Sequence, residues 1–152
     1  MENYEKTLVA GDRVCFLLYA SSKELVRRYK PYLDGLGLTY TQFITMNILW
    51  EKKSLNVKEL GKRLYLDSGT LTPLLKKLET KGLISRNRSK KDERCLDIKI
   101  TSKGAELQRK AADIPNMLSE YVALNEEEET KLDYLLDKLL AAIVQRNTDE
   151  EE

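Results

Sequence analysis

The fold is decided by the stretch LDSGTLTPLLKKLETKGLISRNRSKKDERCLDIKI, residues 66–100. Its first part predicts a helix, because Asp67 or Ser68 can cap the first turn and Gly82 ends the pattern. One face repeats leucine at spacings of three and four and should be buried: Leu71, Leu74, Leu75 and Leu78. The other face carries small hydroxyl and basic side chains that suit a DNA groove: Ser68, Thr70, Thr72, Lys76 and Lys77.

A shorter helix, residues 56–64, precedes this one. Asn56 can cap it, and Glu59 lies three residues later as the reciprocal partner of a capping box. The turn at residues 65–66 joins the two helices, and together they predict a helix-turn-helix. Pro73 lies deep in the second helix and removes a backbone donor, so we expect local distortion there.

Two short strands, residues 83–88 and 95–100, predict a β-hairpin, because apolar and polar residues alternate in both. Cations concentrate toward its tip: Arg86, Arg88, Lys90, Lys91 and Arg94. A guanidinium beside a DNA-reading helix can enter the minor groove, and we assign that role to Arg94. Asp92 is expected to orient an arginine, because a carboxylate close to phosphate is repelled.

Helices are also predicted before this region. Residues 11–33 have apolar positions on more than one side, which suggests burial against their own domain and against a partner. Pro31 predicts a kink or an end in this helix. Residues 39–53 form the next helix, with Thr39 or Thr41 as its cap.

Two more helices are predicted after the hairpin. The first covers residues 102–118, with Thr101 as its cap and a bend near Pro115. Asn125 opens the last, and Glu128 completes its capping box. This helix has a continuous apolar stripe: Leu132, Leu135, Leu136, Leu139, Leu140, Ile143 and Val144. The stripe could close the monomer core, but we favour a dimer interface, since little of its own domain is left to cover.

The expected fold is therefore mainly α with a small β-hairpin wing: a winged helix-turn-helix whose N- and C-terminal helices form a dimerisation region. Four segments are expected: a sensor and dimerisation helix at 1–38, a DNA-binding domain at 39–103, C-terminal dimerisation helices at 104–148 and a disordered tail at 149–152.

Composition excludes several classes of protein. The chain has 152 residues, 34% of them charged, and no apolar run long enough to span a membrane. Polar residues follow Met1 where a secretion signal would be apolar, so we expect a cytoplasmic protein. Histidine is absent, and Cys15 and Cys95 are too far apart for a zinc motif. We therefore expect no enzyme, no metal site and no cofactor.

The net charge of +1 hides a division along the chain. Residues 1–51 carry 6 basic and 6 acidic side chains, residues 52–103 carry 15 and 6, and residues 104–152 carry 5 and 13. The middle segment, at +9, indicates a polyanion-binding module. A solvated basic face is the simpler interpretation, and we rank it below DNA binding because the charge coincides with a helix and hairpin of suitable shape.

Three stretches carry a resemblance to a known family: VCFLLYASSKELVRRYKPYLDGLGLTY at residues 14–40, LDSGTLTPLLKKLETKGLISR at residues 66–86, and DER at residues 92–94. With the order of helices, they resemble the multiple antibiotic resistance regulator (MarR) family of dimeric winged-helix repressors, and within it the organic hydroperoxide resistance regulators. The resemblance covers nearly the whole chain. It implies a homodimer that binds an inverted-repeat operator on double-stranded DNA.

The resemblance also implies roles for single residues. Cys15 corresponds to the peroxide sensor, and Tyr19 and Tyr29 correspond to two tyrosines that hydrogen-bond its thiolate. Arg94 corresponds to the wing arginine that enters the minor groove, with Asp92 as its companion. The implied function is a repressor that leaves its operator when an organic hydroperoxide oxidises the sensor.

Helical geometry bears on this sensor. At about 100° per residue, Tyr19 and Tyr29 lie roughly 40° to either side of Cys15, so the three share a face. Along the axis, Cys15 and Tyr29 are about 21 Å apart and cannot meet within one straight helix. Two antiparallel copies crossing near Ser22 would bring Cys15 of one chain beside Tyr29 of the other. On this hypothesis the sensing site exists only in the dimer.

Cys95 bears on the step that follows oxidation. Family members with a resolving cysteine place it near the C-terminus, and this chain has no cysteine beyond position 95. Cys95 lies at the base of the predicted wing, so a disulfide to Cys15 would need a large rearrangement. We expect a low-molecular-weight thiol to cap the oxidised sensor instead.

Other interpretations stay open. Cys15 could be a small buried hydrophobe, as most helical cysteines are. The chain would then be a repressor released by a phenolic or drug-like ligand, bound between the dimer arms and the DNA-binding domain. A peroxidase is disfavoured, because the chain lacks the Pro, Thr and Arg arrangement that such enzymes place around the cysteine. A pure dimeric adaptor would not need the basic middle segment.

Overall fold

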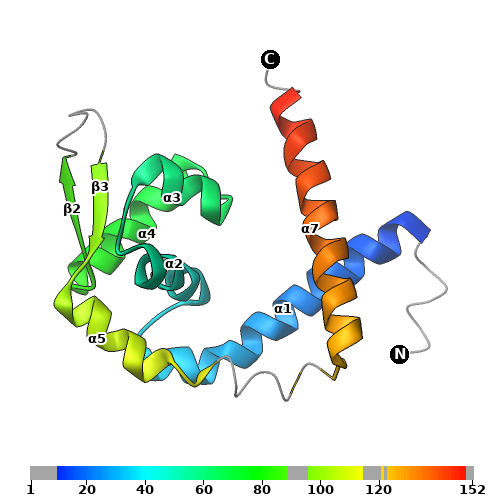
Figure 1. Cartoon of the computed structure of the whole chain (residues 1–152), viewed down its shortest axis with the longest axis horizontal. Helices are drawn as coiled ribbons and strands as arrows, with labels where there is room; N and C mark the ends of the chain where they lie inside the picture. The colour runs from blue at the N-terminus through cyan, green and yellow to red at the C-terminus, as the bar shows by residue number, and fades with distance from the viewer. Residues whose placement is uncertain (1–9, 89–95, 115–120, 122, 150–152) are drawn as a thin grey trace. The chain divides into compact units, whose positions relative to one another are not determined.

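The computed structural model describes residues 10–88, 96–114, 121 and 123–149. Within these residues the elements are α1 (Ala10–Leu36), α2 (Tyr40–Lys52), β1 (Ser54–Asn56), α3 (Val57–Leu64), α4 (Ser68–Thr80), β2 (Ile84–Arg88), β3 (Leu96–Ile100), α5 (Ser102–Ala111) and α7 (Glu126–Asp149) (Figure 1). The chain divides into two compact units, Met1–Pro115 and Asn116–Glu152. The predicted fold class, mainly helical with a small winged sheet, is confirmed.

Helix α1 passes through Pro31 and continues to Leu36, so it does not end at the proline. Its last turns are anchored by Leu33, which is buried in unit Met1–Pro115. Gly37, with a φ of 66°, then ends the helix in the left-handed conformation. The amides of Gly37 and Leu38 donate to the carbonyls of Asp34 and Leu33, each at 3.0 Å, which is the bonding pattern of a Schellman cap.

Helix α2 begins with the capping box of Thr39 and Gln42, which settles the choice between Thr39 and Thr41. The Thr39 hydroxyl accepts from the Gln42 amide at 3.3 Å, and the Gln42 side-chain oxygen accepts from the Thr39 amide at 3.2 Å. Gln42 is buried, with 3% of its surface exposed. A buried polar side chain needs hydrogen-bond partners, so these bonds stabilise the junction between α1 and α2.

The sheet has three strands in the order β1–β3–β2, where two strands were predicted. Strand β1 pairs antiparallel with β3, and Leu55 lies opposite Ile98. The predicted hairpin is formed by β2 and β3, in which Ile84 lies opposite Ile100. Strand β1 was missed because its three residues are too few to show an alternating pattern, and its partner lies far along the chain.

The helix-turn-helix consists of α3 and α4. Asn56 caps α3 by accepting from the Glu59 amide at 2.8 Å. The Glu59 carboxylate does not accept from the Asn56 amide in return, so the predicted capping box is wrong. That carboxylate pairs instead with Arg63, one turn later, at 3.1 Å. Tyr65 ends α3 in the left-handed conformation, with a φ of 53°. At Gly61 an added Cβ would lie 3.1 Å from the Leu66 carbonyl oxygen, so the two helices approach closely at the turn.

Helix α4 is built as predicted. Asp67 is its cap and accepts from the Thr70 amide at 2.9 Å. The four leucines of its inner face are all buried: Leu71, Leu74, Leu75 and Leu78. Gly82, with a φ of 71°, terminates the helix in a Schellman cap. Pro73 does not interrupt the helix, which runs from Ser68 to Thr80.

Helix α5 closes the core of unit Met1–Pro115. Its cap is Thr101, as predicted, but it ends at Ala111 and not near residue 118. Residues 115–118 lie outside the described part of the chain, as does the expected bend at Pro115. Trp50 of α2 donates to the Gly104 carbonyl at 2.8 Å, and this bond fixes α2 against α5.

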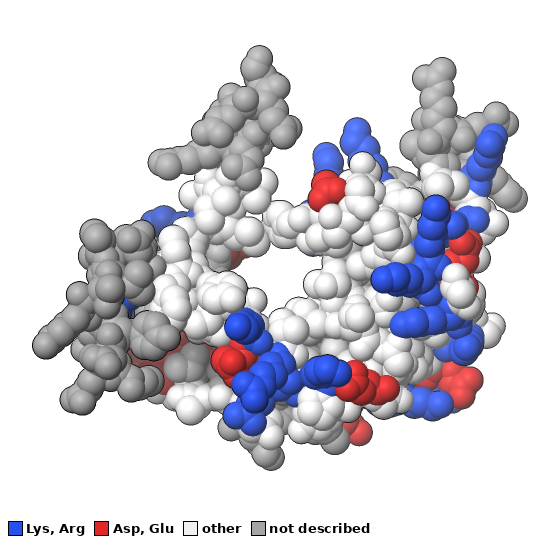
Figure 2. Space-filling model, turned by 180° about the vertical axis from the view of Figure 1, so that it is seen from behind, with Lys and Arg blue, Asp and Glu red and all other residues white. Residues whose placement is uncertain are grey.

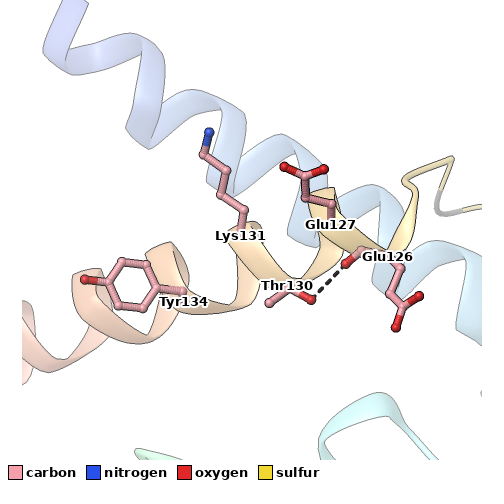
Figure 3. A pocket seen from close by; sticks show the side chains of 5 residues that line it. All are labelled: Glu126, Glu127, Thr130, Lys131 and Tyr134. Atoms are coloured by element: carbon pink, nitrogen blue, oxygen red, sulfur yellow. Dashed lines mark hydrogen bonds between the residues drawn. The ribbon is translucent and has the colours of Figure 1, made fainter.

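Unit Asn116–Glu152 is described mainly through α7. Its predicted capping box is present, because Asn125 and Glu128 exchange hydrogen bonds of 2.9 and 3.0 Å. Near its start is an open hollow of about 670 Å³, where Glu127 and Lys131 project from the same side of the helix (Figure 3). The helix reaches Asp149, and residues 150–152 of the expected tail lie outside the described residues. None of the described helices is long and apolar enough to cross a membrane.

Candidate functional site

The outer face of α4 is exposed, in contrast to its leucine face. The predicted DNA-contacting residues of the helix all lie on this exposed face: Ser68, Thr70, Thr72, Lys76 and Lys77. Thr70 has a second role, because its hydroxyl donates to Asp67 at 2.9 Å. The amide and hydroxyl of Thr70 hold the pKa of the Asp67 carboxyl below its ordinary value, so the cap stays ionised.

The wing is tied to α4 by an ion pair. Arg86 of β2 places Nε 2.8 Å and Nη2 2.6 Å from the same carboxylate oxygen of Glu79. Its side chain is 21% exposed, so it is not at the hairpin tip where we predicted it. The hydrogen bond from Arg86 lowers the pKa of Glu79. Arg88, at the end of β2, is exposed.

The remaining wing residues of the prediction, Lys90, Lys91, Asp92 and Arg94, lie outside the described residues, and so does Cys95. Strands β2 and β3 lie side by side and antiparallel, and Arg88, where β2 ends, lies opposite Leu96, where β3 begins (Figure 1). Figure 2 shows Lys and Arg side chains gathered over the winged-helix unit.

The first half of α1 presents its side chains to solvent. Cys15 is exposed and free, which rules out a buried position for it in the single chain. Tyr19 lies one turn later and is 62% exposed, and the Lys23 ammonium is 5.7 Å from the centre of its ring. The apolar neighbours Val14 and Leu17 are also half exposed. This end of the helix therefore has an apolar surface around the thiol.

The other half of α1 is packed against α2. The Tyr29 ring centre lies 4.9 Å from that of Tyr40 and 5.8 Å from that of Phe43. Burial, together with the neighbouring Tyr40, raises the pKa of Tyr29 above 10.0, so its phenol keeps its proton. Cys15 and Tyr29 do not meet: α1 is continuous between them, and the axial separation is about 21 Å.

Tyr40 is the neighbour that the sequence did not predict. It lies at the start of α2, and only the turn at Gly37 brings it against α1. Tyr29 and Tyr40 belong to two different helices, so the periodicity within one helix could not predict their contact. Within the described residues, no cluster of three or more His, Cys, Asp or Glu side chains could hold a metal ion.

Comparison with known proteins supplies the family. The profile described as Transcriptional regulator SarA/Rot matches residues 27–111. The organic hydroperoxide resistance transcriptional regulator of Bacillus subtilis (strain 168) is 46% identical over 147 residues, which are 97% of this chain and 100% of that protein. The chain belongs to the MarR family of winged-helix transcriptional regulators. This is a DNA-binding and non-enzymatic family, as the sequence predicted.

Solved structures agree with this MarR family assignment. One is the structure of reduced AbfR, a protein of Staphylococcus epidermidis, bound to DNA. It superposes with a TM-score of 0.76 at 29% sequence identity, and the match covers 95% of this chain and 98% of the AbfR chain. Overoxidized AbfR bound to DNA gives a TM-score of 0.72 at 30% identity, covering 93% and 99%. The fold observed here is thus that of regulators solved on DNA.

Proposed function

We propose that this chain is a repressor that senses organic hydroperoxides by oxidation of Cys15 and then releases its operator. One observation carries the proposal. The similarity to the organic hydroperoxide regulator extends over essentially all of both chains, and Cys15 stands exposed on α1 with Tyr19 one turn away. A transcriptional regulator of this kind would act in the cytoplasm.

The DNA-binding surface proposed here combines α4 with the wing. Ser68, Thr72 and the lysines at positions 76 and 77 are exposed on the outer face of α4 and suit base edges and phosphates of a major groove. Arg94 would enter the minor groove from the wing, with Asp92 orienting it. The ion pair of Arg86 with Glu79 supports a positioning role for Arg86, since it fixes the wing relative to α4.

The active form would be a homodimer on an inverted repeat. Each chain offers two uncovered apolar surfaces, the stripe of α7 and the start of α1, and burying them gives a driving force for pairing. Antiparallel crossing of two α1 helices would place Cys15 of one chain near Tyr29 of the other. Tyr40, which packs against Tyr29, would belong to the same site.

The chemistry needs only the thiol, the peroxide and a second thiol. The Cys15 thiolate attacks the terminal oxygen of ROOH, the S–O bond forms as the O–O bond breaks, and alkoxide leaves as ROH after taking a proton. The sulfenic acid then reacts with a low-molecular-weight thiol, which yields a mixed disulfide and water. The tyrosine hydroxyls would orient the sulfur through hydrogen bonds during the first step.

Oxidation would act on DNA through the dimer. A mixed disulfide is larger than a thiol, so the packed helices around Cys15 would have to shift. The spacing of the two α4 helices must match half-sites about one helical turn apart, roughly 34 Å. A shift of the dimer interface would therefore weaken binding of both helices at once.

An operator titration tests the proposal. A duplex selected by the reduced protein from a random pool is bound in the presence of cysteine and then treated with cumene hydroperoxide or hydrogen peroxide. We expect release at lower concentrations of the organic peroxide, and no release from the Cys15→Ser variant. Because AbfR has been solved on DNA in an overoxidized form, the sulfur species must be measured by mass spectrometry in the same samples. If the peroxides release the Cys15→Ser variant from the duplex as readily as the wild type, Cys15 is not the sensor.

A second candidate is a repressor released by a small ligand. A groove of about 400 Å³ lies where the end of α1 meets α5, lined by apolar and cationic residues that include Leu36, Leu107 and Lys110. This volume is within the usual range for small-molecule sites. If a phenolic ligand is the signal, Cys15→Ser should respond to it as the wild type does.

A further inference from the structure

The end of α4 is joined to the end of α1 by one side chain. The Lys81 ammonium donates to the carbonyl of Gly37 at 2.5 Å and to the Gln42 side-chain oxygen at 2.7 Å. Gly37 is the residue that terminates α1, and Gln42 belongs to the box that begins α2. Lys81 itself caps the C-terminus of α4.

Both acceptors of the Lys81 ammonium are held in place by the structure around them. Gly37 has a left-handed conformation within the Schellman cap of α1, so its carbonyl direction is fixed by the end of that helix. Gln42 is buried, and its oxygen also accepts from the Thr39 amide at 3.2 Å. The bonds from Lys81 are charge-assisted, which makes them stronger than neutral ones.

The main chain of Lys81 is held as well. Its carbonyl accepts from the Lys103 ammonium of α5 at 2.8 Å, and the following Gly82 is held in the Schellman cap of α4. The side chain of Lys81 therefore has a fixed base and two fixed acceptors. A displacement of the end of α1 must either carry the end of α4 with it or break both bonds.

We propose that Lys81 is the positioning residue through which movement of α1 reaches the DNA-reading helix. The proposal rests on the function proposed above, because Cys15 is what would move α1. Helix α1 is continuous from Cys15 to its cap, so it can act as a lever of about 33 Å at about 1.5 Å per residue. Thermodynamic linkage then requires the reverse effect: DNA bound at α4 alters the end of α1.

The test uses the full-length protein with Lys81→Met, the rescue variant Lys81→Arg, and Lys110→Met as a charge-matched control from α5, a helix that lines the same groove. Operator affinity is measured for reduced protein and for protein with Cys15 oxidised to the same extent, as confirmed by mass spectrometry. We expect the oxidation-induced loss of affinity to shrink at least about fivefold in Lys81→Met. Lys81→Arg should restore most of it, since a guanidinium keeps the positive charge and offers several N–H donors, and Lys110→Met should behave as wild type.

Two results would overturn the proposal: an unchanged oxidised-to-reduced affinity ratio in Lys81→Met, or the same reduction in Lys110→Met. Thermal unfolding is recorded in parallel, because a purely structural loss would lower the melting temperature without changing the ratio.

If oxidation fails to release even the wild type, the function proposed for Cys15 is wrong, and hydrogen exchange then decides on Lys81. Operator binding should slow exchange of the Gly37 and Leu38 amides in the wild type and in Lys110→Met, but not in Lys81→Met. Equal slowing in all three would overturn the inference by itself.

Discussion

Helices α4 and α7 carry leucine stripes of similar spacing, but the stripe of α4 is buried and the stripe of α7 is exposed. The inner leucines of α4 are at most 9% exposed: Leu71, Leu74, Leu75 and Leu78. The stripe residues of α7 are 36–51% exposed: Leu132, Leu135, Leu136, Leu139, Leu140, Ile143 and Val144. The stripe of α4 is thus covered within its own unit, whereas unit Asn116–Glu152 does not by itself cover the stripe of α7. The start of α1, which carries Cys15, is also exposed.

The most severe test of this contrast compares one leucine from each stripe. Leu78→Ala should lower the free energy of unfolding by about 2–5 kcal/mol, because it leaves a cavity at a fully buried position. Leu136→Ala should act through association, so its effect should depend on protein concentration. Urea unfolding over a wide range of concentrations separates the two. A concentration-independent loss of similar size for Leu136→Ala would mean that α7 is buried within its own chain.

The next test concerns the packing of the winged helix. An added Cβ at Gly104 would lie 2.1 Å from the Leu83 carbonyl oxygen, so Gly104→Ala must push backbone apart. We expect it to lower the free energy of unfolding by about 3 kcal/mol. Gly35→Ala is the matched control in α1, where nothing lies within 4 Å, and it should stabilise by up to about 1 kcal/mol. Equal unfolding midpoints for the two variants would contradict the close packing of α5.

The smallest effect is expected at the junction of wing and α4. Arg86 lowers the pKa of Glu79 from its ordinary value of 4.5, so the pair stabilises the fold above that pH. This contribution is lost as the pH falls through the lowered pKa and Glu79 takes up a proton. Glu79→Gln should therefore be less stable than wild type at neutral pH and equal to it in acid, as measured by urea midpoints. In an Arg86→Gln background, Glu79→Gln should have no further effect at any pH.

Features with local causes were predictable from the sequence. Asp67 caps α4 and Gly82 ends it, because capping depends on residues within one turn. The burial of the α4 leucines followed from their spacing. The same reasoning failed at Glu59, where two local partners compete and the ion pair with Arg63 wins over the capping bond.

Features with distant causes were not predictable. Strand β1 forms because Leu55 pairs with Ile98, which is far along the chain. Arg86 lies within β2, opposite Ile98, and forms an ion pair with Glu79 of α4. The contact of Tyr40 with Tyr29 likewise depends on the turn between two helices. For Cys15 and Tyr29, helical geometry alone already predicted that one chain cannot join them, and α1 is indeed continuous between the two residues.

Mixed dimers test this central claim most directly. Chains with Cys15→Ser and chains with Tyr29→Phe are given different tags, and the mixed dimer is purified. If the site joins Cys15 of one chain to Tyr29 of the other, the mixed dimer retains one complete site. Its Cys15 should then react with cumene hydroperoxide at the wild-type rate, while the Tyr29→Phe homodimer reacts more slowly. A mixed dimer as slow as the Tyr29→Phe homodimer, or equal rates in all three, would contradict a sensor shared between chains.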